Sequence, residues 1–367
     1  MNSRELYTGN AAAAESAIRA GCRFYYGYPI TPQNEVPAYM SRRLPEVGGV
    51  FLQSESEIAA INMCFGAAAA GVRVMTSSSS PGVSLKQEGI SYLAGADLPC
   101  VIMNIMRGGP GLGSIAPSQA DYFQATRGGG HGDYRTLVLA PYSVQEMVDL
   151  VRLAFDLADT WRMPTMILGD GQLGQMMEPV TMPDFIDPDT LPEKPWALTG
   201  AKGRKQNIIR SYKPASLEEY NNELVARYEK IMATEPRWES TGVEDADVDV
   251  VAYGTCARHA KELVVRRDEW GLNVGLIRPI TLWPFPVEPI VRACRTAKRF
   301  LVVEMAWQQL TEDVRLAVEG RCPVDWFGRL GGGVPTTGQI LEEARRIMDA
   351  GTATLLGSCQ SSDNANR

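Results

Sequence analysis

The chain has 367 residues, of which 45% are hydrophobic and 22% charged, as is usual for a globular protein. At about 100–200 residues per domain, this length predicts two domains. The formal net charge of -7 excludes a protein held to nucleic acid by a basic surface. We see no signal peptide and no long uncharged apolar run, so we expect a cytoplasmic protein that binds neither nucleic acid nor membrane.

The first half of the chain alternates helical and strand patterns. Helices are predicted at 10–21, at 54–71 and in SLKQEGISYLAGA, and strands in RFYYGYPI, VRVMTSSSS and PCVIMNIM. After a glycine-rich loop and a short helix come the strand TLVLAP, the helix SVQEMVDLVRLAFDLADTW and the strand PTMILGDG. Strands and helices of these lengths predict βαβ units, and nearly continuous apolar strands fit a parallel sheet covered on both faces.

Residues 186–245 break this rhythm with polar segments rich in proline and glycine, which predict loop. One helix is predicted inside them, at 216–232, where Ser216 and Glu219 have capping-box spacing. Its apolar stripe consists of Leu217, Tyr220, Leu224, Tyr228 and Ile231. A linker helix docked on a domain is the plain interpretation, and a partner-binding helix is the alternative.

A second alternation of strands and helices begins near residue 246 and predicts a smaller α/β domain. The predicted fold is therefore α/β, with two doubly wound parallel-sheet domains. We expect these domains at 1–190 and 246–352, a linker with a docked helix at 191–245, and a flexible tail at 353–367.

In open α/β sheets, ligands bind beyond the carboxyl ends of the strands. Four unusual loops are predicted at such ends: YPITPQNE, QSESE, TSSSSPGVS and MRGGPGLGS. The first has two prolines that fix the backbone around Ile30 and Thr31. The third offers consecutive hydroxyl groups that either cap the next helix or contact a ligand. A further loop, RGGGHGDY, is more simply a mobile loop than the site of a catalytic His131.

Glu57 is predicted at the start of a helix with almost no other polar residue. Ser54 and Glu57 have capping-box spacing, and a carboxylate in the first turn also suits the helix dipole. The functional alternative is a carboxyl group in an apolar pocket that can hold or give a proton. Glu55 is the rival carboxylate, but two residues away it faces another direction.

The loop MRGGPGLGS follows the most apolar strand of the sequence. Its glycines present backbone N–H groups and Arg107 adds a positive fork, a combination that suits a carboxylate or phosphate. The alternative is a tight turn with a surface arginine. The loop is neither a Walker loop nor a dinucleotide fingerprint, because the required spacings are absent.

Five segments together resemble the α subunit of 2-oxoacid:ferredoxin oxidoreductases: YPITP (28–32), QSESEIAAINMCFGAAAAGVR (53–73), SSPG (79–82), MRGGPGLG (106–113) and LWPFP (282–286). The branched-chain (2-oxoisovalerate) type is most similar, and the 2-oxoglutarate type comes next. The resemblance covers about residues 5–350. It implies a thiamine-diphosphate enzyme whose cofactor lies between subunits, with this chain supplying the pyrimidine-binding domain and a transketolase-C-like domain.

The resemblance also implies partner subunits. A β subunit would supply the diphosphate and Mg²⁺ site, which fits the GDG triplet at 169–171, where the asparagines that complete such a motif are missing. The [4Fe-4S] clusters would lie on the β subunit and on a small ferredoxin-like iron–sulfur subunit, which fits the absence of C-x-x-C pairs here. A γ subunit is a further candidate partner. The implied reaction is oxidative decarboxylation of a 2-oxoacid to acyl-CoA and CO₂, with coenzyme A as co-substrate and electrons passed to ferredoxin or another acceptor.

Residue by residue, Glu57 falls at the family's glutamate, and its implied role is to hydrogen-bond the pyrimidine N1′. Thr31 matches the threonine that holds the substrate carboxylate, Arg107 matches the arginine beside it, and Gly108 is expected next to them. The implied cofactor contacts are Tyr28, Pro29, Ile30, Glu57 and Ser80, and no metal ligand is expected in this chain.

Two departures from the family's pattern bear on the substrate. Gln33-Asn34 and Gly111-Leu112 stand where relatives tend to carry hydroxyl residues, which favours an apolar or aromatic 2-oxoacid. Three alternatives stay open: the α subunit of a 2-oxoglutarate oxidoreductase, a homomeric thiamine-diphosphate decarboxylase or transketolase-like enzyme, and a non-enzymatic scaffold.

Overall fold

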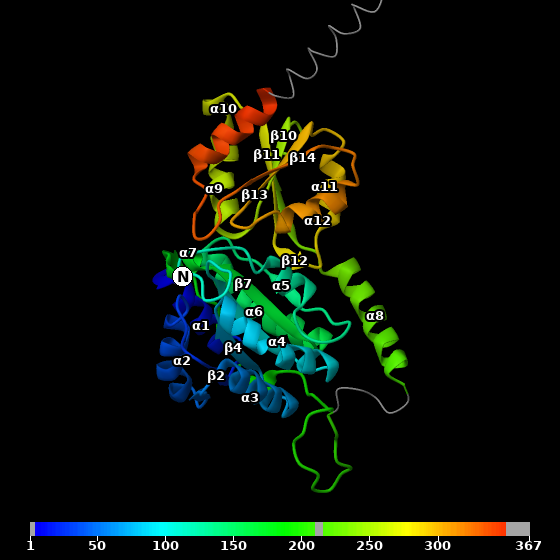
Figure 1. The fold of residues 1–367 in the computed structure, drawn as a ribbon. Coiled ribbons are helices and arrows are strands. Elements are labelled where there is room, and N and C mark those ends of the chain that lie inside the picture. The colour runs from blue at the N-terminus through cyan, green and yellow to red at the C-terminus, as the bar shows by residue number, and fades with distance from the viewer. Residues whose placement is uncertain (1–3, 210–215, 350–367) are drawn as a thin grey trace, which may run out of the picture.

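A computed structural model describes residues 4–209 and 216–349 of the chain (Figure 1). The predicted tail at 353–367 lies outside these residues. Two α/β domains are stacked end to end, the first drawn from blue to green and the second from yellow to red in Figure 1. No helix in the described ranges has the length and hydrophobicity that a membrane crossing requires.

The first domain is built on a seven-stranded sheet with the order β12-β6-β7-β5-β4-β2-β3. Its strands are β2 (Phe24–Gly27), β3 (Val50–Gln53), β4 (Val74–Ser78), β5 (Cys100–Met106), β6 (Leu137–Leu139), β7 (Pro164–Asp170) and β12 (Thr281–Trp283). All neighbouring strands are parallel except β12, which pairs antiparallel with β6. Every residue of β4, β5 and β7 is buried, because helices cover both faces of the sheet.

Two helical layers enclose this sheet, as the predicted doubly wound fold requires. The layers comprise α1 (Gly9–Arg19), α2 (Glu35–Glu46) and α6 (Val144–Trp161) on one face, and α3 (Glu57–Ala69), α4 (Ser80–Gly95) and α5 (Tyr122–Arg127) on the other. A short helix, α7 (Gly171–Gln175), follows β7. A two-stranded ribbon of β1 (Glu5–Thr8) and β8 (Met177–Val180) lies outside the main sheet.

The second domain has a five-stranded sheet with the order β14-β13-β10-β11-β9. Its elements are β9 (Trp238–Thr241), β10 (Val248–Val251), α9 (Gly254–Val265), α10 (Arg267–Trp270), β11 (Val274–Pro279), α11 (Val287–Ala293), β13 (Arg299–Glu304), α12 (Gln309–Val318) and β14 (Val324–Gly328), followed by a helical segment at 337–349. The strands are parallel apart from β9, which runs antiparallel to β11.

The segment between the domains differs from the predicted linker at its end. The structure assigns 238–241 to the second sheet, although the sequence predicts linker up to 245. The four residues of β9, Trp-Glu-Ser-Thr, have no hydrophobic alternation that would distinguish them from loop. Within the linker, α8 (Leu217–Thr234) begins at Ser216, whose hydroxyl accepts a hydrogen bond from the Glu219 N–H.

Helix α8 packs along the first domain and reaches the second (Figure 1). Four members of its predicted stripe are buried, namely Tyr220, Leu224, Tyr228 and Ile231, whereas Leu217 in the first turn is exposed. Arg227 forms an ion pair of 2.8 Å with Asp97 after α4. The Tyr228 ring meets Trp283 of β12 edge-on at 5.6 Å.

Buried and half-buried hydrogen bonds join the two domains. The Gln119 side-chain amide donates to the Tyr253 carbonyl at 2.9 Å and accepts from the Met305 N–H at 2.9 Å. Arg127 donates two hydrogen bonds to the Asp313 carboxylate, at 2.7 and 3.0 Å. The carboxyl edge of the first sheet therefore faces the second domain and is held there by polar side chains.

Candidate active site

The four loops singled out in the sequence gather at the carboxyl ends of β2, β3, β4 and β5. These four strands are adjacent in the sheet, in the order β5-β4-β2-β3. Parallel strands end at the same edge, so four segments between residues 28 and 114 come together there.

Glu57 is the first residue of α3, but it takes no part in capping the helix. The N-cap is Ser56, in an extended conformation, and its hydroxyl accepts a hydrogen bond from the Ala59 N–H at 3.2 Å. The capping box expected between Ser54 and Glu57 is therefore wrong. The Ser54 hydroxyl instead donates to the Gly27 carbonyl at the end of β2. The Glu57 carboxylate is thus left available for another role.

The Glu57 side chain is buried, with 6% of its surface exposed, and lies against Gly82 in the first turn of α4. A methyl group on Gly82 would come within 2.6 Å of Glu57 Oε1 and 2.1 Å of the Ser78 hydroxyl. No group in residues 4–209 or 216–349 donates a hydrogen bond to this carboxylate. A largely buried carboxylate that receives no donor from the described residues is open to a ligand on the side that it still exposes.

The hydroxyl groups of the TSSSSPGVS loop divide into two kinds. Those of Ser78 and Ser79 are buried and find no hydrogen-bond partner in the described part of the chain. Ser79 is the N-cap of α4, yet its side chain caps nothing. The Ser80 hydroxyl, in contrast, has two partners, because it accepts from the Arg107 N–H at 2.9 Å and donates to Asp121 at 2.6 Å.

Asp121 is a site residue that the sequence reasoning missed. Its carboxylate accepts hydrogen bonds from Ser80 and from the Asn104 side chain, the latter at 2.9 Å. Burial raises the pKa of Asp121, and these two hydrogen bonds oppose the rise. The only sequence signal for this network is Asn104, a polar residue inside the apolar strand PCVIMNIM.

The Arg107 side chain is buried rather than a surface group, with 8% of its surface exposed. Its guanidinium donates to the main-chain carbonyls of Thr31 at 2.9 Å and Leu112 at 3.0 Å. Its Nε is buried without a hydrogen-bond partner, and within the described ranges no carboxylate forms an ion pair with it. A buried, unpaired cation attracts an anionic ligand.

The glycine-rich loop is closed by its own backbone. The Gly108 N–H donates to the Ala116 carbonyl at 2.9 Å, and the Gly108 carbonyl accepts from the Ser114 N–H at 2.8 Å. Gly113 has a φ of +60°, and a side chain there would overlap the Gly108 carbonyl. Leu112 and Ile115 project outward from this loop and are 82% and 65% exposed.

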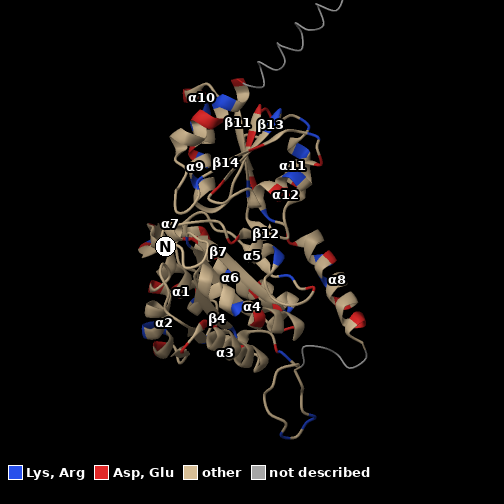
Figure 2. Cartoon of the chain, viewed as in Figure 1, with Lys and Arg blue, Asp and Glu red and all other residues tan. Residues whose placement is uncertain are grey.

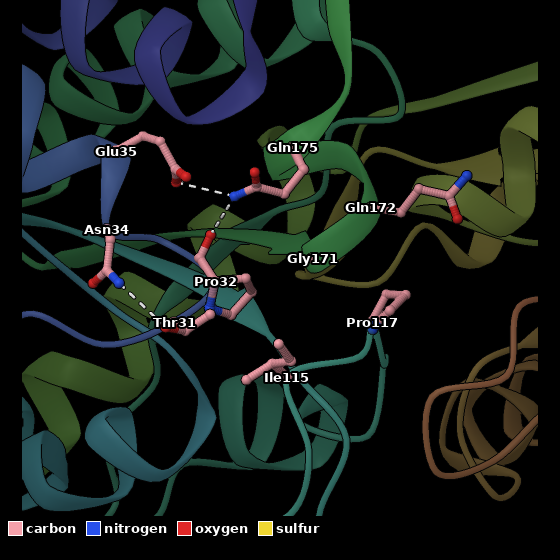
Figure 3. A pocket seen from close by; sticks show the side chains of 9 residues that line it. All are labelled: Thr31, Pro32, Asn34, Glu35, Ile115, Pro117, Gly171, Gln172 and Gln175. Atoms are coloured by element: carbon pink, nitrogen blue, oxygen red, sulfur yellow. Dashed lines mark hydrogen bonds between the residues drawn. The ribbon is translucent and has the colours of Figure 1, made fainter.

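Thr31 borders a cavity of about 540 Å³ (Figure 3). The lining residues are Thr31, Pro32, Asn34, Glu35, Ile115, Pro117, Gly171, Gln172 and Gln175. The Thr31 hydroxyl accepts a hydrogen bond of 3.2 Å from Asn34, and the Gln175 amide bridges Glu35 and the Pro32 carbonyl, at 3.0 and 2.9 Å. Glu35 and Gln175 are further residues that sequence reasoning missed. Neither Glu57 nor Arg107 lines this cavity.

The remaining predicted cofactor contacts lie on the loop after β2. Tyr28 and Pro29 are exposed and Ile30 is half-buried. Gln33, one of the departures from the family's pattern, is buried, and its side-chain oxygen accepts a hydrogen bond from the Ser77 hydroxyl. Gln33 therefore ties the loop to β4.

Asp170 of the GDG triplet has a structural function. Its carboxylate accepts hydrogen bonds from the N–H groups of Gln172 and Leu173 and from the Thr255 hydroxyl and N–H. Burial raises the pKa of Asp170, and these donors oppose the rise. The carboxylate caps α7 and joins the two domains. His131 lies elsewhere, on a cavity between α4 and α8.

Comparison with known protein families gives two matches. Residues 15–236 match the thiamine-diphosphate-binding domain of pyruvate flavodoxin/ferredoxin oxidoreductases. Residues 246–340 match core domain II of pyruvate:ferredoxin oxidoreductase. Together these matches span both domains of the chain.

Relatives of similar length carry related names. The chain is 48% identical to the ketoisovalerate oxidoreductase subunit VorB of Methanothermobacter thermautotrophicus, over 94% of this chain and 97% of the relative. It is 37% identical to the 2-oxoglutarate synthase subunit KorA of the same organism, over 93% of this chain and 98% of the relative.

A solved structure has the same fold. The 2-oxoglutarate:ferredoxin oxidoreductase from Magnetococcus marinus, solved with 2-oxoglutarate, coenzyme A and succinyl-CoA bound, superimposes with a TM-score of 0.81 at 26% identity. The match covers 94% of this chain and 65% of that one. An inactive split-gene transketolase tetramer, at a TM-score of 0.58 and 14% identity, shares the fold alone. From its fold, its matched domains and its relatives, the chain belongs to the family of 2-oxoacid:ferredoxin oxidoreductases.

Proposed function

We propose that this chain is the α subunit of a thiamine-diphosphate-dependent 2-oxoacid oxidoreductase that converts an apolar, branched-chain 2-oxoacid to its acyl-CoA. One observation carries the proposal: the Glu57 side chain is buried where α3 approaches Gly82 closely, and no group among the described residues donates a hydrogen bond to its carboxylate. The 48% identity to a ketoisovalerate oxidoreductase subunit supports the choice of a branched-chain acid.

The residues around Glu57 fit the pyrimidine end of thiamine diphosphate. The Ser78 and Ser79 hydroxyls are buried without partners in the described residues, so they are free to meet a polar ring. Glu57 would hold a proton at the pyrimidine N1′, and Tyr28, Pro29 and Ile30 would cover the ring from the loop after β2. When bound, thiamine diphosphate supplies the carbon nucleophile that attacks the 2-oxo group.

Ser80 fits a cofactor contact less well than its neighbours do. Its hydroxyl proton is used by Asp121 and one of its two lone pairs by the Arg107 N–H, so it has no proton left to donate to a cofactor. Ser80 would therefore act by holding the Arg107 backbone. Any contact of Ser80 with the cofactor would come from its main chain in the first turn of α4.

The substrate carboxylate would lie between Thr31 and Arg107, next to Gly108. The Nε–H of Arg107 is buried without a partner, and no carboxylate among the described residues pairs with this guanidinium, so it can receive an anion. A hydroxyl and one guanidinium hold a carboxylate without surrounding it. This suits a substrate carboxylate, because that group must later leave as CO₂. The exposed Leu112 and Ile115 beside them favour an apolar acid over a second carboxylate.

The diphosphate, Mg²⁺ and [4Fe-4S] clusters would be held by partner subunits. The Asp170 carboxylate, the one acid of the GDG triplet, is already engaged by four N–H and O–H donors. This observation favours a β subunit as the source of the metal site over a homomeric enzyme. A small ferredoxin-like subunit and ferredoxin itself would then carry the electrons.

Helix α3 offers the surface on which a β subunit would dock. Glu57 is its single charged residue, and Figure 2 draws the helix almost entirely in tan, whereas α8, α9 and α11 carry red or blue segments. Ile58 and, on neighbouring α4, Leu85 and Tyr92 are exposed. An uncharged, partly apolar helix face on the surface of a soluble domain is typical of a protein interface.

Reconstitution tests this function. The chain is co-expressed with its partner subunits, and reduction of a viologen dye is followed with coenzyme A and 2-oxoisovalerate, 2-oxoglutarate, pyruvate or indolepyruvate. We expect the highest kcat/KM with 2-oxoisovalerate and no turnover by the chain alone. A preference for 2-oxoglutarate would contradict the proposed branched-chain substrate. Turnover by the isolated chain would contradict the proposed heteromeric enzyme.

A further inference from the structure

Lys86 is a buried lysine next to the proposed cofactor site. It lies in the second turn of α4 with 0% of its surface exposed, against the strand β4. Its ammonium donates a hydrogen bond of 2.9 Å to the Thr76 hydroxyl, which is its one hydrogen-bond partner in the described part of the chain. Lysine is almost never fully buried unless it is paired, so this position calls for a specific reason.

The packing of α3 on α4 directs the Lys86 side chain toward Glu57. The two helices approach most closely where Gly82 meets Glu57 and where a Cβ on Gly89 would come within 2.4 Å of Ile61. Lys86 lies between these contacts, one turn after Gly82. Side chains on a helix lean toward its N-terminus, so Lys86 extends over the position where Gly82 has no side chain.

Strand β4 fixes how far the Lys86 ammonium lies from the Glu57 carboxylate along the strand direction. Thr76, which holds the ammonium, and Ser78, which lies against Gly82, point to the same face of β4. Two residues of a strand span about 7 Å. From this spacing we infer that the Lys86 ammonium lies about one strand repeat from the Glu57 carboxylate, across the position of Gly82.

Among the described residues, Glu57 is the one carboxylate whose charge acts on Lys86. Burial lowers the pKa of Lys86 to about 8, and the charge of Glu57 opposes this fall. The other titratable groups that face the ammonium are the thiols of Cys64 on α3 and Cys100 on β5. Since interactions between charges are strong where water is excluded, a Glu57 carboxylate favours the charged form of Lys86.

We propose that Lys86 is a positioning residue that keeps Glu57 ionised once Glu57 has given its proton to the pyrimidine N1′. The inference rests on the proposed function, because only that function assigns Glu57 a proton to share with the pyrimidine N1′. A methionine would fill the same volume without a charge, so packing alone does not explain a lysine here. The ammonium shifts the shared proton away from the carboxyl group and toward the cofactor nitrogen.

A pH dependence follows from this arrangement. Lys86 supports Glu57 only while it is charged, and its charge is lost as the pH rises through about 8. Activity should therefore decline on the alkaline side in that range. Without Lys86, Glu57 would hold its proton more tightly, and the acid limb of the profile should move to higher pH.

The first experiment measures the interaction without cofactor or turnover. The free energy of unfolding of the full chain is compared for wild type, Glu57→Gln, Lys86→Met and the double variant, at pH 7 and pH 10. We expect the two substitutions to be non-additive at pH 7 and additive at pH 10, where Lys86 is neutral. Additivity at both pH values would overturn the proposal. This readout stands even if the complex proves to have a different activity.

The second experiment uses the reconstituted complex. Lys86→Met is expected to lower kcat about tenfold, with a KM for the 2-oxoacid within about twofold of wild type and an acid limb shifted up by about one pH unit. The matched control is Lys194→Met, which removes a largely buried lysine paired with Asp159 away from the site. An unchanged pH profile in Lys86→Met would overturn the proposal.

A second variant covers the case in which Lys86→Met fails to fold. Thr76→Val keeps the ammonium but removes the hydroxyl that accepts its hydrogen bond. The pKa of Lys86 should then fall further, so the alkaline limb should move to lower pH while the acid limb stays in place. An alkaline limb identical to that of wild type would contradict the role assigned to Lys86.

Discussion

The guanidinium of Arg107 donates a hydrogen bond of 2.9 Å to the main-chain carbonyl of Thr31. Residues on two different strand ends, 76 positions apart in the sequence, are thereby held as one unit. The bond fixes the loop on which the Thr31 hydroxyl lies and leaves the buried Arg107 Nε free. In the proposed site for a substrate carboxylate, this bond would hold the two donors in a fixed relative position.

Replacing Arg107 with lysine should weaken substrate binding. Lysine retains the positive charge, but its single nitrogen cannot reproduce the planar fork whose two separate nitrogens bond the Thr31 and Leu112 carbonyls. We expect the KM for the 2-oxoacid to rise by roughly ten- to a hundredfold, as the loss of a charge-assisted hydrogen bond predicts. Steady-state kinetics of the complex measures this. Arg315→Met, an exposed arginine on α12, is the control, and an unchanged KM in Arg107→Lys would remove Arg107 from the substrate site.

Glu57→Gln should abolish most of the activity while leaving the complex assembled. Glutamine has the same shape but cannot transfer a proton, and loss of a general acid–base group lowers kcat by about 10²- to 10⁴-fold. The neighbouring Glu55→Gln is the matched control, because Glu55 is exposed and lies before the helix. Reduced kcat in both variants, or in neither, would contradict the assignment of Glu57.

Gly82→Ala should displace the Glu57 carboxylate. The added methyl group would come within 2.6 Å of Glu57 Oε1 and 2.1 Å of the Ser78 hydroxyl, so one of them must move. Alanine otherwise favours a helix, so the chain should still fold. We expect kcat to fall at least about tenfold with little change in thermal unfolding of the isolated chain, since a misplacement of about 1 Å has a large effect on catalysis. Wild-type kcat in this variant would mean that the carboxylate position is not critical.

Gly66→Ala should have opposite effects on the stability of the isolated chain and on its binding to a β subunit. Gly66 lies on α3, and an added Cβ would meet nothing within 4 Å. Alanine should therefore stabilise the isolated chain by roughly 0.5–1 kcal/mol. If a β subunit covers α3, the same methyl group should weaken its binding. Titration of the two purified subunits by calorimetry measures this, and unchanged affinity would indicate that the β subunit binds elsewhere.

Asp249 should make the stability of the second domain depend on pH. Its carboxylate is buried in β10, and neither oxygen has a hydrogen-bond partner in the described residues. Burial, and after it the charge of Glu244, raises the pKa of Asp249 to about 7. The folded chain therefore binds this proton more tightly than the unfolded chain does. Its contribution to stability is fully present below about pH 4 and is lost as the pH rises toward 7.

Asp249→Asn should remove this dependence. We expect a smaller fall in the unfolding temperature between pH 5 and pH 8 than in wild type, and a higher unfolding temperature at pH 8. Differential scanning calorimetry at the two pH values provides the measurement. The same pH dependence in the variant would show that Asp249 does not titrate in this range.

The sequence predicts the α/β alternation and the doubly wound first domain because each strand and helix there has a strong local period. It also predicts Thr31, Glu57 and Arg107 as neighbours, since parallel strand ends share an edge. It misses β12, because nothing in TLW tells which sheet the strand will join. It places the cap of α3 at Ser54 instead of Ser56, because both serines precede a helix-forming run.

The polar residues that support the site are harder to predict. Lys86 stands in SLKQEGISYLAGA, where lysine is ordinary for a helix surface, and only the close approach of Gly82 and Gly89 to α3 reveals that this face is buried. Asp121 and Gln175 depend on contacts between segments far apart in the chain. Local patterns carry no information about such contacts.

The strand β12 belongs to the second half of the chain but pairs with β6 at the edge of the first sheet. Removing the second domain would therefore leave β6 as an open edge, and the hydrogen bonds of Gln119 and Asp170 would lose their partners. The two domains should consequently unfold in a single cooperative transition rather than one after the other. Hinge motion within this chain is disfavoured for the same reason, so the large movements of a catalytic cycle would belong to the chains assembled around it.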